Sequence, residues 1–127
     1  MKLKTILAVS ATLMTLSIPL AFAQMKGMDH TKMMEMMTPQ PGDPASTKDL
    51  KEAHMDMMKN MNMEFTGNAD VDFARSMVKH HEGAITMAKV QLKHGKDPEI
   101  RGMAEKIIKD QEKEIADFNS WLKKNAK

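Results

Sequence analysis

The sequence predicts an all-α protein, a small antiparallel helical bundle of three main helices preceded by a flexible, methionine-rich N-terminal arm. Three observations support this prediction. Apolar residues recur every three or four positions between residues 46 and 122. Turn residues, namely Gly67, Asn68 and Gly95, separate the periodic segments. No segment shows the regular alternation of apolar and polar residues that is typical of a half-buried strand.

The first 23 residues have the pattern of a secretory signal peptide. Lys2 and Lys4 precede an apolar run that ends at the small-residue triplet of residues 21–23. Pro19 interrupts this run, and no second apolar stretch approaches the roughly 20 residues that a membrane span needs. We therefore expect cleavage before Gln24 and a soluble, exported, periplasmic protein that does not interact with the membrane. An uncleaved N-terminal anchor is the alternative.

The composition of the remaining chain excludes several classes of partner. Loss of Lys2 and Lys4 lowers the count of basic residues from 19 to 17, which equals the 17 acidic residues. Without a basic stripe, neither nucleic acid nor an anionic membrane is an expected partner. Cysteine is absent, so disulfides and thiolate chemistry are excluded. Methionine is unusually frequent: of 16 in the chain, only Met1 and Met14 leave with the signal peptide.

Residues 24–45 form the predicted arm, and residues 46–127 form the predicted helical domain. Pro39, Pro41 and Pro44 preclude a continuous helix at the end of the arm. We expect at most one or two helical turns near residues 33–37, ordered by a bound ligand.

The helical domain divides into three periodic segments. The first runs from about 47 to 63 and starts with a sequence typical of a capping box at residues 46–49. The second runs from about 70 to 94, with Gly95 as the expected C-cap. The third begins at the N-cap Asp97 with Pro98 in its first turn. The short connection between the second and third helices predicts an antiparallel hairpin.

The methionines could fill a core or bind a soft metal ion. In the first helix, one face carries Leu50, His54, Met57, Met58 and Met61. Methionine is a flexible core filler, but a core made of methionine is poorly specified, and the arm has no core to fill. Thioethers in a chain without cysteine favour a soft monovalent ion, Cu(I) above all. Candidate ligands are therefore His54, Met57, Met58 and Met61 in the helix, and Met28, His30, Met33, Met34, Met36 and Met37 in the arm.

The second helix carries the adjacent pair His80 and His81. At about 100° per residue the two imidazoles diverge, so that His80 shares a side with Met87 and His81 shares a side with Met77. A single histidine on an apolar face is more often a core residue than a ligand. A pair beside two methionines makes all four side chains candidate ligands. In the third helix, Glu112 and Glu114 are expected on a solvated face. If the histidines are not ligands, packing or hydrogen bonds to Gln111 or Glu114 across the hairpin are the alternative.

The segment from residue 72 to residue 122 resembles a known family. The matching residues include Asp72-Phe73-Ala74, Met77, His80-His81-Glu82-Gly83-Ala84-Ile85, Met87-Ala88, Asp97-Pro98-Glu99-Ile100, Gln111 and Trp121-Leu122. The family is the exported ferritin-like domain family of unknown function (DUF305-like), which includes CopM-type periplasmic copper-binding proteins. The resemblance covers about residues 46–124. It implies a ferritin-like four-helix bundle and, for the copper-binding members, Met and His ligands in copper or silver tolerance, carried here by Met77, His80, His81 and Met87.

The sequence therefore predicts a non-enzymatic metal buffer or carrier that holds Cu(I), and also Ag(I) or Cu(II). A copper efflux or carrier protein is a candidate partner, and pairing of two chains into a homodimer stays open. A di-iron oxidase would need inward Glu-x-x-His pairs, which the sequence lacks. The alternative is a methionine-rich binding module for a partner protein, or a scavenger whose methionines absorb oxidants.

Overall fold

The computed structural model describes residues 30–126, which form four α-helices and no β-strand. The helices are α2 (His30–Met37), α3 (Ala45–Met61), α4 (Ala69–His94) and α5 (Pro98–Asn125). The all-α class is confirmed, but the expected number of three helices is wrong within this range. The additional helix, α2, lies in the predicted arm, at the place where the sequence predicts one or two helical turns near residues 33–37. The predicted signal peptide, residues 1–23, lies outside the described residues.

Side-chain caps fix where α4 and α5 begin. The Oδ1 atom of Asn68 accepts hydrogen bonds from the backbone N–H groups of Asp70 and Val71, at 3.1 and 3.2 Å. At α5 the Oδ1 atom of Asp97 accepts from the N–H of Ile100 at 3.0 Å, which confirms the predicted cap. The predicted capping box of α3 is wrong, because this helix begins after Pro44 without any side-chain cap.

The turn between α4 and α5 is closed by a side chain. Arg101 donates from Nη1 to the carbonyl oxygens of Leu92 and Gly95, at 2.6 and 2.9 Å. It thereby satisfies carbonyl groups that the end of α4 leaves without a helical partner. Gly95 caps α4 as predicted, although its φ of −72° is not the left-handed conformation typical of a glycine cap.

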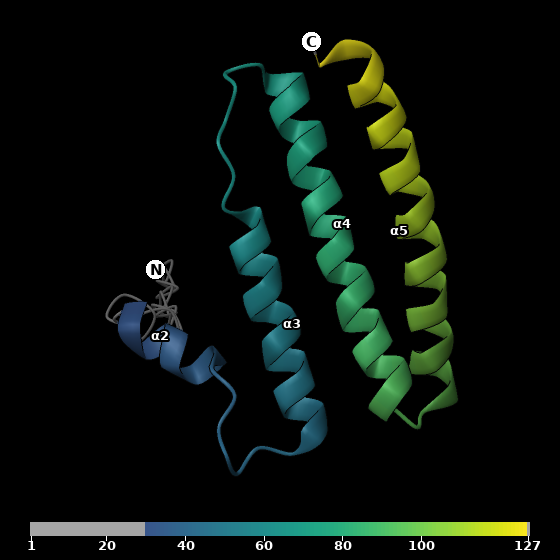
Figure 1. Cartoon of the computed structure of the whole chain (residues 1–127). Helices are drawn as coiled ribbons and strands as arrows, with labels where there is room; N and C mark the ends of the chain where they lie inside the picture. Colours follow the sequence, from purple (N-terminus) through teal and green to yellow (C-terminus); the bar gives the residue numbers. More distant parts are fainter. Residues whose placement is uncertain (1–29, 127) are drawn as a thin grey trace, which may run out of the picture.

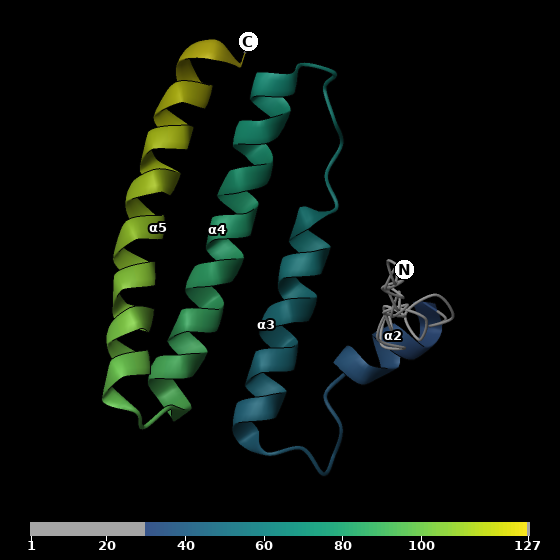
Figure 2. The ribbon, with the colours of Figure 1, turned by 180° about the vertical axis from the view of Figure 1, so that it is seen from behind.

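The three long helices lie side by side in one layer with α4 in the middle (Figures 1 and 2). Helix α4 contacts both α3 and α5, whereas α3 and α5 do not contact each other. The predicted antiparallel hairpin of the second and third long helices is confirmed as α4–α5. Helix α2 contacts α3 alone among the described helices, and therefore lies at the outer edge of the layer.

Ion pairing holds the connection between α2 and α3 in place. The carboxylate of Asp43 lies 2.8 Å from the Nζ atom of Lys51 and accepts a hydrogen bond of 2.8 Å from the N–H of Gln40. These hydrogen bonds, that from Lys51 first, lower the pKa of Asp43. Lys51 also donates to the carbonyl oxygen of Thr38 at 3.3 Å. This network anchors α2 against the first turns of α3.

The core is built from small and medium-sized side chains, and no large side chain in the described part of the chain is fully buried. The buried residues are Ala53, Val71, Ala74, Val78, His81, Gly83, Ile85, Ala88 and Ala104. The expected core-facing stripe of α3 is wrong in part, since Leu50 and Met58 are exposed and Ala53 is buried instead. An open layer leaves such side chains uncovered because each outer helix has only one long neighbour.

Candidate metal site

The two faces of the layer differ in chemistry. Counting about 100° per residue from Ala53, Gly83 and Ala104, which are buried, one side of all three helices carries most of the large apolar and sulfur-bearing residues. We call this side the open face. It carries Leu50, His54, Met57, Met58 and Met61 of α3, Phe73, Met77, His80, Ala84 and Met87 of α4, and Ile100, Met103, Ile107, Phe118 and Trp121 of α5.

The opposite face is charged. A shallow groove between α3 and α4 on this side is lined mainly by Asp49, Glu52, Asp56, Thr86, Lys89 and Lys93. Asp49 accepts hydrogen bonds from Lys93 Nζ at 2.6 Å and from His94 Nε2 at 2.7 Å. These bonds, that from His94 first, lower the pKa of Asp49. The charged face is thus an ion-paired, solvated surface, and His94 is engaged there.

Helices α3 and α4 come close together where the side chain of Met57 packs against Gly83. A Cβ atom built on Gly83 would lie 2.6 Å from Met57 Sδ and 2.4 Å from Met57 Cγ, so only glycine leaves room for this side chain. His80 precedes Gly83 by three residues and Met87 follows it by four, each about one helical turn away on the open-face side. The sequence of α4 thus supplies an imidazole on one side of this contact and a second thioether on the other, each about one turn along the helix.

The imidazole of His54 lies one turn before Met57 on α3. Its Nδ1 atom is 2.9 Å from the carbonyl oxygen of Leu50. A carbonyl oxygen can only accept, so Nδ1 carries the proton and the lone pair of the neutral ring is on Nε2. Metal-binding histidines commonly have this arrangement, in which a backbone carbonyl fixes the tautomer and the ring orientation. His54 is therefore prepared to bind through Nε2.

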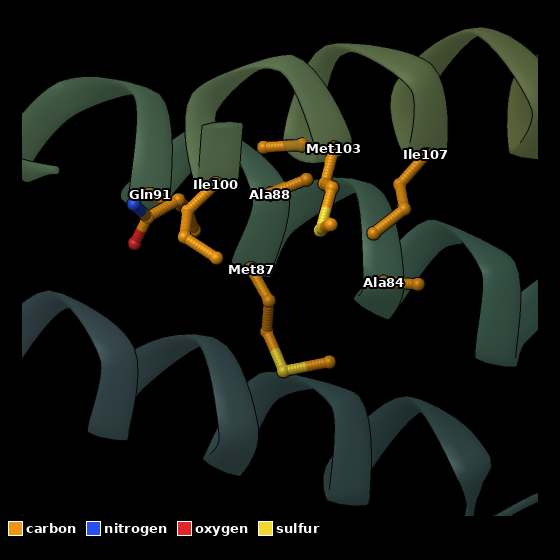
Figure 3. A pocket seen from close by; sticks show the side chains of 8 residues that line it. Ala84, Met87, Ala88, Gln91, Ile100, Met103 and Ile107 are labelled. Carbon is orange, nitrogen blue, oxygen red and sulfur yellow. The ribbon is translucent and has the colours of Figure 1, made fainter. Parts of the chain in front are cut away.

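The open face carries further sulfur atoms. Met58 and Met61 follow Met57 within about one turn of α3, and Met77 precedes His80 by three residues on α4. In Figure 3, Met87 extends from α4 on the side of α3, and Met103 extends from α5 beside Ile107. Met103, which is 52% exposed, lines with Met87 an apolar groove of about 360 Å³ between α4 and α5. The sequence predicts Met103 only as part of an apolar stripe, although its residue type is the signal that could have identified it as a donor.

His81 has different surroundings from His80. It is only 4% exposed, and its Nε2 donates to Glu114 Oε2 of α5 at 2.5 Å. Its ring packs edge-on against Phe118 with centroids 5.8 Å apart. Its Nδ1 is buried and has no hydrogen-bond partner in the described part of the chain. His81 could therefore reach an ion only through Nδ1.

The contact between His81 and Glu114 joins α4 to α5. Glu114 is exposed as expected, and its carboxylate also reaches across the hairpin to His81, which is the alternative to metal binding that the sequence offers. The two adjacent histidines differ in burial, in agreement with their predicted divergence: His81 is buried and His80 is exposed on the open face, although the two rings stay in edge contact.

The arm residues form a separate group. Met33, Met34, Met36 and Met37 lie on α2, which contacts α3 but neither α4 nor α5 among the described helices. Met33 and Met36 are exposed. Met28 lies outside the described residues, as does the side chain of His30. The structure thus places the candidates of α3 and α4 on two packed helices, and those of α2 on a helix that contacts α3 only.

The donor chemistry of the open face is soft. Within residues 30–126, no group of three or more His, Asp or Glu side chains converges in the way that a harder metal ion requires. An ion at Met57 would meet thioethers and imidazoles instead. The helices of residues 30–126 also include none with the length and apolarity needed to cross a membrane.

The fold and this face define a class of protein, a small all-α helical domain with a methionine- and histidine-lined surface. The chain belongs to the family described as Domain of unknown function (DUF305), which matches residues 11–122. The family membership inferred from the His80-His81 segment is thereby confirmed. The chain is also similar to Uncharacterized protein L153 of Acanthamoeba polyphaga mimivirus, with 42% identity over 53 residues. That match covers 42% of this chain and 35% of the relative, so the chain spans about a third of the relative's length.

Proposed function

We propose that the protein binds Cu(I), and by the same ligand softness Ag(I), on the open face, and that it acts as a buffer or carrier in copper tolerance rather than as an enzyme. One observation carries this proposal: Met57 lies on Gly83 with His80 and Met87 one turn to either side. The free Nε2 of His54 adds a second imidazole nearby. Two thioethers with two imidazoles suit Cu(I) better than Zn(II) or Mg(II), and the imidazoles alone could also hold Cu(II).

Thioether ligands also fit the proposed compartment. Export to the periplasm, which the N-terminal 23 residues suggest, places the protein where thiols are oxidised to disulfides. A thioether has no proton to lose and forms no disulfide, so it remains a ligand there. The copper-binding CopM-type proteins that this chain resembles support the same proposal.

The methionines of α2 extend the proposal to a second group of ligands. They lie apart from α4, so the two groups would bind ions independently. Exposed thioethers on a short helix at the edge of the layer suit a place where Cu(I) is exchanged with a copper efflux or carrier protein.

A second function is favoured by the exposure of several methionines. Met33, Met36, Met58 and Met103 are all exposed, and exposed thioethers react first with oxidants to give sulfoxides. They would also form an adaptable surface for a partner protein. Both alternatives predict that the purified protein retains no copper when Cu(I) is offered, so mass spectrometry after metal loading separates them from the metal-binding proposal.

Replacing Met57 and Met87 with leucine should weaken Cu(I) binding at the open face by at least about a hundredfold, since groups that only orient a ligand already contribute about ten- to hundredfold. Leucine has nearly the same volume, so the fold should be retained. The measurement is a competition with a chromophoric Cu(I) probe under reducing conditions, on a chain that lacks residues 24–37. Met55→Leu, on another side of α3, is the matched control and should bind as the parent does. Equal affinity in parent and double variant would contradict the proposed site.

A further inference from the structure

The open face leaves an unusual amount of apolar surface uncovered. Seven large side chains on it are 38% to 59% exposed, namely Leu50, Met58, Phe73, Ile100, Met103, Ile107 and Trp121. Aromatic side chains have about 150–250 Å² each and the five aliphatic ones are smaller, so together the seven expose roughly 500 Å² of apolar surface per chain. This is near the upper end of what a monomer exposes as one patch, and it is more than half of the roughly 800 Å² per partner of a stable protein–protein interface.

The chain's own arm is too short to cover this face. Helices α4 and α5 have 26 and 28 residues, which corresponds to a length of about 40 Å at 1.5 Å per residue. Helix α2 has only eight residues, about 12 Å, and the Asp43–Lys51 pair holds its connection at the outer edge of α3. If cleavage occurs before Gln24, only six residues precede α2. Neither the length nor the anchoring of the arm suits it to cover a face of this size.

Four charges beside the face are paired within α5. Lys106 binds Asp110, and Lys113 binds Asp117 at 2.8 Å, both one turn apart. Two acidic residues lie nearer the face: Asp70 lines a groove with Phe73 and Trp121, and Glu114 binds the buried His81. An apolar centre with a polar rim is the usual anatomy of a protein–protein interface.

We propose that a second copy of this chain covers the open face, so that the two α4–α5 hairpins pack face to face as a four-helix bundle with one α3 on each side. A two-fold axis makes the same patch serve both subunits, and each hairpin supplies a partner of the required length. Ile100, Met103 and Ile107 would then become buried. The inference goes beyond the proposed copper binding and does not depend on it, because the apolar contacts exist without metal.

The test is the mass of the mature chain, residues 24–127, freed of metal with a chelator and measured by sedimentation equilibrium between about 1 and 200 μM. We expect a dimer, and Ile107→Lys should raise the dissociation constant at least about a hundredfold, because a charge cannot be buried unpaired in the interface. Ala116→Lys adds the same charge at an exposed position of α5 away from the open face and should remain dimeric.

Three results would overturn the inference. One is a monomer throughout the concentration range. Another is a dimer that Ile107→Lys weakens no more than Ala116→Lys does, which would place the interface elsewhere. The third is a monomer that dimerises only after deletion of residues 24–38, which would make the arm the natural cover. Circular dichroism checks that Ile107→Lys is helical; if it is not, Ile100→Lys on the same stripe replaces it.

Discussion

Lowering the pH from about 7.5 to 5 should weaken Cu(I) binding at the open face by roughly 1.5 decades for each histidine ligand, about 2 kcal/mol each. A histidine must be neutral to bind a metal ion, and imidazole ordinarily takes up a proton below about pH 6.5. With His54 and His80 as ligands the loss is about three decades. Thioethers have no such competition, so the methionines of α2 should hold Cu(I) almost equally at both pH values.

Alanine variants separate ligand histidines from the others in this experiment. The double variant His54→Ala and His80→Ala should bind Cu(I) more weakly at pH 7.5 but lose little further affinity at pH 5. His94→Ala is the matched control, because His94 binds Asp49 on the charged face, and it should keep the full pH dependence. The competing probe's own proton dependence has to be subtracted. If the double variant and the unmodified protein lose the same factor of Cu(I) affinity between pH 7.5 and pH 5, neither histidine is a ligand.

His81→Ala should lower the free energy of unfolding by roughly 2–4 kcal/mol, because it leaves a cavity between α4 and α5 and removes the hydrogen bond to Glu114. For a domain of this size the loss corresponds to a fall in Tm of roughly 10–20 °C. Thermal unfolding followed by circular dichroism of the metal-free protein measures it.

The neighbouring histidine supplies the control for this second prediction. His80 is exposed, so His80→Ala should change the unfolding free energy by no more than about 0.5 kcal/mol. His81→Ala should therefore change mainly the stability of the protein, whereas His80→Ala should change mainly its affinity for Cu(I). Equal stability of the two variants would mean that the buried contact between His81 and Glu114 contributes nothing to the fold.

Local sequence patterns were sufficient for most of the helical architecture. The spacing of apolar residues located the three long helices to within about two residues at the ends predicted for them, and Asp97 with Pro98 located the start of α5. These features depend on neighbours within a few residues, through capping and helical periodicity. The short connection at Gly95 was enough to predict the α4–α5 hairpin.

The candidate site depended on contacts between distant residues, which periodicity does not specify. Met57 was predicted as one of several equivalent methionines, and only the packing of α3 on α4 distinguishes it by placing it on Gly83. Glu114 lies 33 residues after His81, and the sequence could name it only as one of two possible partners across the hairpin, beside Gln111. Helix α2 was predicted only as one or two turns near residues 33–37, because three nearby prolines indicate an irregular chain, although they follow the helix rather than interrupt it.

The most direct test of copper binding is a metal titration of the mature chain under anaerobic, reducing conditions, followed by native mass spectrometry. We expect at least one Cu(I) to stay bound to the chain lacking residues 24–37, and equimolar Zn(II) not to displace it, because thioethers favour the softer ion. A folded, helical protein that retains no Cu(I) would show that the open face is not a copper site. So would displacement by Zn(II), which would indicate a histidine and carboxylate site around His80, His81 and Glu82.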